Sequence, residues 1–279
     1  MLAAVALAAC GGSDEGTAEP SAPPPASDTA RLEHIHGLGV GPENGTLYVA
    51  THYGLFEAPD GEQKVRRIGD SEQDIMGFSV VSDDRFIGSG HPDPNDTDSP
   101  PNLGLIESRD GGRTWENISL SGDADFHVLQ SAGERIYGFD GTQGRLMVSN
   151  DGGRSWEQRT PPAAMFDLAI DPRNENRIVT STEGGVFAST DAGKGWRPLR
   201  DDIAGLLAWS APGALYLVDG QGQVQRSADG GRQWQPASGI GGQPAAFIAR
   251  EDELYAALGD GTVKRSTDGG ASWSVRATP

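Results

Sequence analysis

The sequence predicts an all-β protein, a six-bladed β-propeller of four-stranded antiparallel blades. Two observations lead to this prediction. A motif with the spacing Ser-x-Asp-x-Gly-x-x-Trp recurs five times, beginning at residues 108, 149, 189, 227 and 266. Gly and Pro supply 40 and 18 of the 279 residues, which is typical of short strands joined by many turns. A repeat of about 40 residues that holds four short strands is the blade of a propeller.

Each repeat has the same order of elements. Two short apolar runs come first, as in residues 36–40 and 46–50, and a glycine then opens a third run. These glycines are Gly54, Gly104, Gly144, Gly185, Gly222 and Gly261. The apolar residue five positions before each motif aspartate is expected in the core; this column is Leu55, Leu105, Leu146, Val186, Val224 and Val263. A degenerate sixth copy at residues 58–61 has Val65 in place of Trp, so six blades fill residues 31–279.

The motif residues close a tight turn in this prediction, because Ser and Asp side chains hydrogen-bond nearby backbone amides and Trp buries a large ring. The structural aspartates are Asp110, Asp151, Asp191, Asp229 and Asp268. The motif resembles the Asp-box (BNR) repeat of sialidases, sortilin-type receptors and photosystem II assembly factors. This resemblance implies that the turns lie at the outer lower edge of the propeller, away from the ligand site. It does not select one activity, because the superfamily hosts several.

The N-terminal residues 1–10 end in Leu7-Ala8-Ala9-Cys10 and resemble the lipobox of bacterial lipoproteins, in which the cysteine is lipidated. No basic residue precedes the apolar stretch, so we expect the true signal peptide to begin upstream. Residues 11–30 are rich in Pro, Ala, Ser and acidic residues, and we expect them to form a disordered tether. The resemblance therefore implies an extracytoplasmic protein that is lipid-anchored to the bacterial cell membrane through Cys10.

Charge and cysteine count exclude several classes of protein. The formal net charge of −18 disfavours nucleic acid as a partner, because phosphate would be repelled. The single cysteine excludes a disulfide framework and a cysteine-based zinc site. No apolar run approaches the roughly 18 residues of a transmembrane helix.

All five histidines lie within residues 34–127, and alignment of the repeats places them at one mouth of the central channel. His36, Met76 and His127 stand at the start of the first strands of blades 1–3. His52 and His91 end the second strands of blades 1 and 2. Asp74 and Asp125 lie two residues before Met76 and His127, and residues two apart share one face of a strand.

This convergence predicts a transition-metal site, because imidazole suits Zn and Cu and a thioether favours Cu(I). The expected ligands are His36, His52, His91 and His127, with Met76 as a further ligand and Asp74 and Asp125 as ligands or orienting groups. At least three of the four imidazoles should then meet at one centre. The alternatives are a polar pocket for a small molecule or a peptide, and a purely structural role for these side chains.

The insertion at residues 91–102 is expected to overhang the same mouth. Asp93, Asn95, Asp96 and Asp98 offer oxygen ligands for calcium, but the full calcium-loop pattern is absent. A solvated acidic lid is the alternative for this loop.

An enzyme of the sialidase type would need further residues. That resemblance implies an arginine triad for the substrate carboxylate, and no Arg stands at the first-strand mouth positions. A glycoside hydrolase, exo-sialidase-like or of another kind, needs two carboxylates, and the candidates are Asp74, Asp125 and Asp167. We expect instead a membrane-anchored binding module for an unknown protein, glycan or metal ligand, with the glycoside hydrolase as the alternative.

Overall fold

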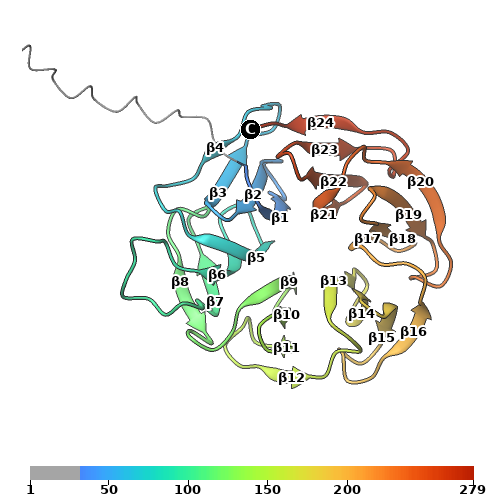
Figure 1. The fold of residues 1–279 in the computed structure, drawn as a ribbon, viewed down its shortest axis with the longest axis horizontal. Coiled ribbons are helices and arrows are strands. Elements are labelled where there is room, and N and C mark those ends of the chain that lie inside the picture. The colour runs from blue at the N-terminus through green and yellow to red at the C-terminus, as the bar shows by residue number, and fades with distance from the viewer. Residues whose placement is uncertain (1–31) are drawn as a thin grey trace, which may run out of the picture.

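The computed structural model describes residues 32–279 and folds them into six blades around a central channel (Figure 1). Cys10 and the predicted tether lie outside these residues. Each sheet has four strands, and their order in space follows their order in the chain. The predicted six-bladed β-propeller is therefore confirmed. Within residues 32–279, no helix has the length and apolar character needed to cross a membrane.

The strands form four concentric sets. The innermost strands, which surround the channel, are β1 (Ile35–Val40), β5 (Asp74–Val80), β9 (Phe126–Ala132), β13 (Met165–Asp171), β17 (Leu206–Ala211) and β21 (Pro244–Arg250). The second strands are β2 (Leu47–Thr51), β6 (Phe86–His91), β10 (Arg135–Asp140), β14 (Asn174–Thr182), β18 (Ala214–Val218) and β22 (Glu253–Leu258). The third strands are β3 (Gly54–Ala58), β7 (Leu105–Ser108), β11 (Arg145–Ser149), β15 (Gly185–Ser189), β19 (Gln223–Ser227) and β23 (Val263–Ser266). The outermost strands are β4 (Arg66–Arg67), β8 (Glu116–Ser119), β12 (Glu157–Arg159), β16 (Arg197–Arg200), β20 (Gln235–Gly239) and β24 (Ser274–Ala277).

The hydrophobic core consists of six layers, each between two neighbouring blades. Between blades 1 and 2, for example, Tyr48 and Leu55 pack with Phe78 and Phe86. The column that begins with Leu55 is buried in every blade. A single blade therefore buries its faces only against its neighbours, and the ring is the cooperative unit.

The outer lower turns repeat one set of hydrogen bonds. In blade 3, Ser149 Oγ accepts from the Gly153 N–H at 2.8 Å and donates to Asp151 Oδ1 at 2.8 Å. The equivalent pair of bonds occurs in all five motif copies. Gly153 has a positive φ of 88°, and a Cβ there would lie 2.0 Å from the Leu105 side chain of blade 2. Each such turn thus also fixes the approach of its blade to the preceding one.

The ring closes without strand exchange, because blades 1 and 6 are each built from four consecutive strands. Blade 1 lacks the motif, and Arg276 on β24 takes its place. The Arg276 guanidinium donates to the carbonyl oxygens of Ala58 at 2.9 Å, Pro59 at 3.1 Å and Glu62 at 2.6 Å. Thr278 also forms a parallel bridge with the segment before β4.

Candidate functional site

A β-bulge near the start of the innermost strand re-aims one residue in five of the blades. In blade 1 the pairing steps from Ile35 to Gly37 and leaves His36 out of the ladder. A bulge of this kind leaves one residue unpaired and turns its side chain to a new direction. The bulged residues are His36, Met76, His127, Phe166 and Ala245.

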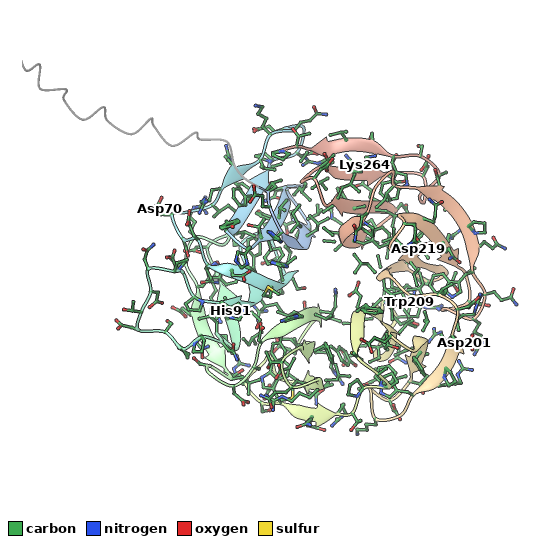
Figure 2. The ribbon with its side chains drawn as sticks, viewed as in Figure 1. Asp70, His91, Asp201, Trp209, Asp219 and Lys264 are labelled. Carbon is green, nitrogen blue, oxygen red and sulfur yellow. The ribbon has the colours of Figure 1, made fainter. Side chains whose placement is uncertain are left out.

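All five bulged residues line a small cavity of about 80 Å³ at the upper end of the channel. Among the described residues, none that lines this cavity is Arg or Lys. A second cavity of about 340 Å³ occupies the lower channel and is lined largely by apolar side chains, with Trp209 (labelled in Figure 2) among them. All the histidines that line either cavity line the upper one, whereas the polar side chains of the lower cavity are Ser79, Gln130, Ser131 and Arg250.

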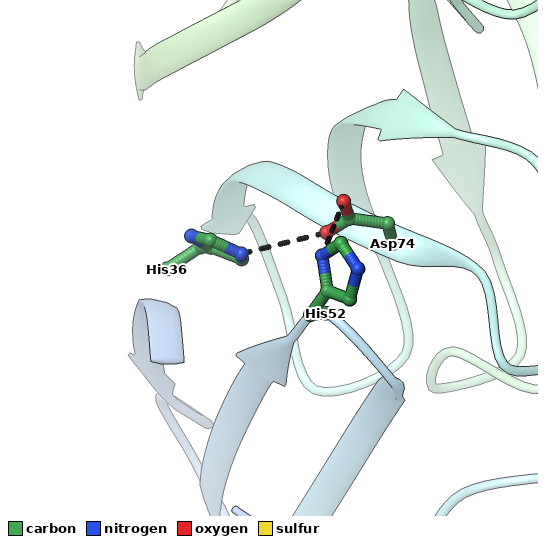
Figure 3. Close-up of side chains that lie close together, drawn as sticks. All are labelled: His36, His52 and Asp74. Atoms are coloured by element: carbon green, nitrogen blue, oxygen red, sulfur yellow. Dashed lines mark ion pairs between the residues drawn. The ribbon is translucent and has the colours of Figure 1, made fainter. Parts of the chain in front are cut away.

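His36, His52 and Asp74 converge at the edge between blades 1 and 2 (Figure 3). Asp74 is 8% exposed and begins β5; its Oδ2 lies 2.8 Å from His52 Nδ1 and its Oδ1 lies 3.5 Å from His36 Nε2. One potential ligand atom from each of the three residues lies within 4.8 Å of the other two. The described part of the chain holds this single group of three His or acidic residues with metal-ligand spacing.

The pair formed by His36 Nε2 and Asp74 Oδ1 is buried and has no hydrogen-bond partner among the described residues. Burial lowers the pKa of His36, and the charge of Asp74 only partly opposes this. A neutral imidazole keeps a lone pair on one nitrogen, which is the form that binds a metal. Two ligands on a tetrahedral ion with bonds of about 2.1 Å stand roughly 3.4 Å apart, close to the observed separation.

Asp125 holds a second group one blade further on. It lies just before β9 and is 2% exposed. Its Oδ2 is hydrogen-bonded to His127 Nε2 at 2.8 Å and lies 3.7 Å from His91 Nε2. The hydrogen bond with Asp125 raises the pKa of His127. Asp125 Oδ1 is buried without a partner.

The four predicted imidazole ligands therefore do not meet at one centre. His36 and His52 gather on Asp74, whereas His91 and His127 gather on Asp125. The reason is that the two carboxylates occupy equivalent places in successive blades and are separated by one blade step. Met76 lies between the two groups at the bulge of blade 2 and lines the upper cavity with both His36 and His127.

Asp167 has a different environment from the other two candidate carboxylates. Its Oδ1 accepts from the Leu168 N–H at 2.7 Å and its Oδ2 accepts from the Leu207 N–H at 2.8 Å. These bonds tie blade 4 to blade 5. Burial raises the pKa of Asp167 to about 7, although both backbone bonds oppose the shift.

The insertion after β6 folds back on blade 2 through its acidic side chains. Asp93 accepts from the backbone N–H groups of Glu72 at 2.7 Å and Asn95 at 2.8 Å. Asp96 accepts from the N–H groups of Asp98 and Ser99. Two of the carboxylates expected as calcium ligands are thus acceptors of backbone N–H groups: Asp96 holds a turn within the loop, and Asp93 also ties the loop to the segment before β5.

Exposed aromatic side chains at the mouth were not predicted as site residues. Phe166 is 48% exposed at the bulge of blade 4, and Tyr53 is 36% exposed beside His52. Tyr53 is two residues beyond the end of β2, so its position next to His52 in the sequence was the available signal. His34 is exposed, has a positive φ of 55°, and makes no ion pair with Asp74.

A family model and several solved structures are similar to this chain. A family model described as photosynthesis system II assembly factor YCF48 matches residues 101–207. A search of the curated proteins gives no match. The solved structure of YCF48 bound to D1 peptide is 20% identical, with a TM-score of 0.51, over 76% of this chain and 69% of that one. YCF48 from Cyanidioschyzon merolae is 14% identical, with a TM-score of 0.55, over 88% and 85% of the two chains.

A glycosidase has a similar fold. The GH74 xyloglucanase from Xanthomonas campestris is 19% identical, with a TM-score of 0.57, over 87% of this chain but 45% of the enzyme. At these identities the likeness shows the fold alone. Six four-stranded blades and five Asp-box turns define a class, the Asp-box propellers. The chain is similar to the Asp-box (BNR) β-propellers, since its fold matches theirs and the family model matches residues 101–207.

Proposed function

We propose that this protein is an extracytoplasmic, lipid-anchored binding module that holds a late transition-metal ion at His36, His52 and Asp74. The observation that carries the proposal is the buried, unpartnered pair of His36 Nε2 and Asp74 Oδ1, 3.5 Å apart. Two imidazoles and one carboxylate suit Zn or Cu and leave coordination positions open. The ion would satisfy both buried atoms at once.

A binding role also agrees with what is known of similar folds. YCF48, which has the same fold, has been solved with D1 peptide bound. The mouth of this chain adds exposed Phe166 and Tyr53 to the ion site, and aromatic side chains are enriched in protein interfaces. The open coordination positions of the ion would then face a protein or glycan partner.

Metal binding is tested by equilibrium dialysis of the full chain, freed of metal with a chelator, against Zn²⁺ and then Cu²⁺, with the bound metal measured by mass spectrometry. The double variant His36→Ala/His52→Ala should bind one ion fewer per chain than the wild type. His34→Ala is the matched control, because it removes an imidazole near β1 that makes no ion pair with Asp74. Equal binding by the double variant and the wild type would reject the site.

Anchoring is tested separately by cell fractionation. Lipidation at Cys10 would hold the protein in the membrane fraction, and Cys10→Ala should release it. A Cys10→Ala protein that stays with the membrane would overturn the anchor.

The alternative function is a glycoside hydrolase using Asp74, Asp125 or Asp167. The geometry favours it less, because each carboxylate is already engaged by histidines or by backbone N–H groups. Hydrolysis of a glycan panel by the wild type, lost in Asp74→Asn/Asp125→Asn, would establish the hydrolase and displace the binding proposal.

A further inference from the structure

The groups on Asp74 and Asp125 are related by one blade step. The backbone of Asp74 pairs with that of His91 across β5 and β6. His91 occupies the position in blade 2 that His52 occupies in blade 1. Each carboxylate is thus approached by an imidazole from the end of the second strand in the blade before it. The approach of an imidazole from the preceding blade is therefore found at Asp74, from His52, and again at Asp125, from His91.

His91 is held in the tautomer that a metal ligand needs. Its Nδ1 lies 2.7 Å from the carbonyl oxygen of Pro101, which can only accept, so Nδ1 carries the proton. The other nitrogen, Nε2, then presents a lone pair to Asp125 Oδ2 at 3.7 Å. A cation placed between these two atoms would be favourable to both lone pairs. A histidine ligand whose second nitrogen donates to a backbone carbonyl is the usual arrangement around protein-bound metals.

His127 reaches Asp125 because blade 3 has a glycine where blades 1 and 2 have His52 and His91. A Cβ at Gly141 would lie 2.9 Å from the His127 ring, so the missing side chain is the space that the ring fills. The ring is therefore placed by its surroundings, with Nε2 at 2.8 Å from Asp125 Oδ2.

Only one of the two carboxylate oxygens of Asp125 is hydrogen-bonded within the described residues. The residue is 2% exposed, and its Oδ1 has no hydrogen-bond partner among the described residues. A buried carboxylate oxygen without a partner is costly. The side chains of His91 and His127 are 40% and 45% exposed, and their Nε2 atoms lie 3.7 Å and 2.8 Å from the same oxygen, Asp125 Oδ2.

We infer that Asp125, His91 and His127 form a second binding site for a divalent late transition metal, so that the mouth holds two ions, one blade apart. This inference deepens the proposed function and rests on it for the chemistry of the mouth. The second site takes the same class of metal as the first, since it offers the same donors, two imidazoles and one carboxylate.

The number of bound ions tests the inference. The metal-free full chain is dialysed against Zn²⁺, and bound zinc per chain is measured for the wild type and two double variants. We expect two ions for the wild type and one each for His36→Ala/His52→Ala and His91→Ala/His127→Ala. Circular dichroism of each variant checks that the propeller is folded.

A single substitution tests the second site without removing a ligand. Gly141→Ala places a methyl group against the His127 ring and should weaken the second ion at least fivefold in a zinc titration, with the first ion unchanged. Ala substitution at Gly259, which lies in the equivalent loop of blade 6 with open space around it, is the control.

The outcomes separate the two proposals. One ion in the wild type, lost from His36→Ala/His52→Ala and kept by His91→Ala/His127→Ala, overturns the second site and leaves the proposed function standing. The reverse pattern overturns the first site and supports the second. No bound zinc or copper in any form overturns both.

Discussion

The lower edge and the upper mouth of this propeller differ in how regularly their residues repeat from blade to blade. At the lower edge, five blades repeat one turn with the same two serine hydrogen bonds. At the mouth, the five bulged residues are of four different kinds, and the histidines are confined to blades 1–3. The difference teaches that repetition marks what holds the ring together, whereas departure from repetition marks where a ligand can be recognised. Mouth substitutions should therefore change binding, and edge substitutions should change stability.

The largest effect is expected at the mouth. Asp74→Asn keeps the shape of the side chain but removes the charge that faces His36 and His52, so affinity for the first ion should fall on the order of 100-fold. Thermal unfolding should change little by comparison. Isothermal titration with Zn²⁺ measures the affinity, and Asp260→Asn, in the exposed loop of blade 6, is the control. Unchanged affinity in Asp74→Asn would remove this carboxylate from the site.

The next largest effect is expected at the closure of the ring, where blade 1 lacks the turn motif and Arg276 takes its place. Arg276→Met should lower the free energy of unfolding by about 2 kcal/mol, because three carbonyl oxygens of blade 1 lose their donor while the apolar stem is kept. Denaturant unfolding measures this change. Arg197→Met on the exposed face of β16 should have almost no effect. Equal stability of the two variants would show that Arg276 is not needed for closure.

A smaller effect is expected within one regular turn. Ser149→Ala leaves the buried Gly153 N–H without an acceptor and should cost about 1.5 kcal/mol of unfolding free energy. Asn150→Ala changes the exposed neighbour in the same turn and serves as the control. Zinc stoichiometry should be the same in both variants. A loss of bound zinc in Ser149→Ala would contradict the separation of edge from mouth.

The smallest effect is expected on the free energy of unfolding at low pH. The Thr114 hydroxyl and backbone N–H hold the pKa of Asp110 down to about 2, below the value near 3.9 of an unfolded chain. The folded pKa is depressed, so this contribution to stability is complete above pH 4 and is lost as the pH falls toward 2. Asp110→Asn should flatten the decline of unfolding free energy between pH 4 and pH 2. Denaturant curves at pH 4, 3 and 2 measure it, and an unaltered slope would contradict the assignment.

The fold could be predicted from the sequence because its cues are local. The turn motif, the glycine before each third strand and the buried column from Leu55 to Val263 each depend on a few neighbouring residues. The closure of the ring by Arg276 could not be predicted in this way. Its partners lie more than 200 residues away in the chain and are backbone carbonyls, which carry no sequence signal.

The sequence predicted which histidines and carboxylates gather at this end of the channel, but not how they are arranged. Strand positions brought the histidines to one mouth, since these positions repeat with the blades. Their division between Asp74 and Asp125 depends on the bulges and on side-chain rotamers, which the repeat alignment does not show. Asp167 was a third candidate carboxylate, yet its oxygens accept from the backbone N–H groups of Leu168 and Leu207. A carboxylate's partners across a blade boundary are invisible in a one-dimensional alignment.

Closure without strand exchange has a consequence for the order of the blades. Every blade is an unbroken stretch of chain, and Leu32 and Pro279 both lie against Gly261. A circular permutant that joins residue 279 to residue 32 and opens at residues 160–164 would keep all six sheets intact. The three blades that carry the histidines would then sit at the end of the polypeptide instead of its beginning. The geometry of the mouth therefore does not depend on which blade comes first in the chain.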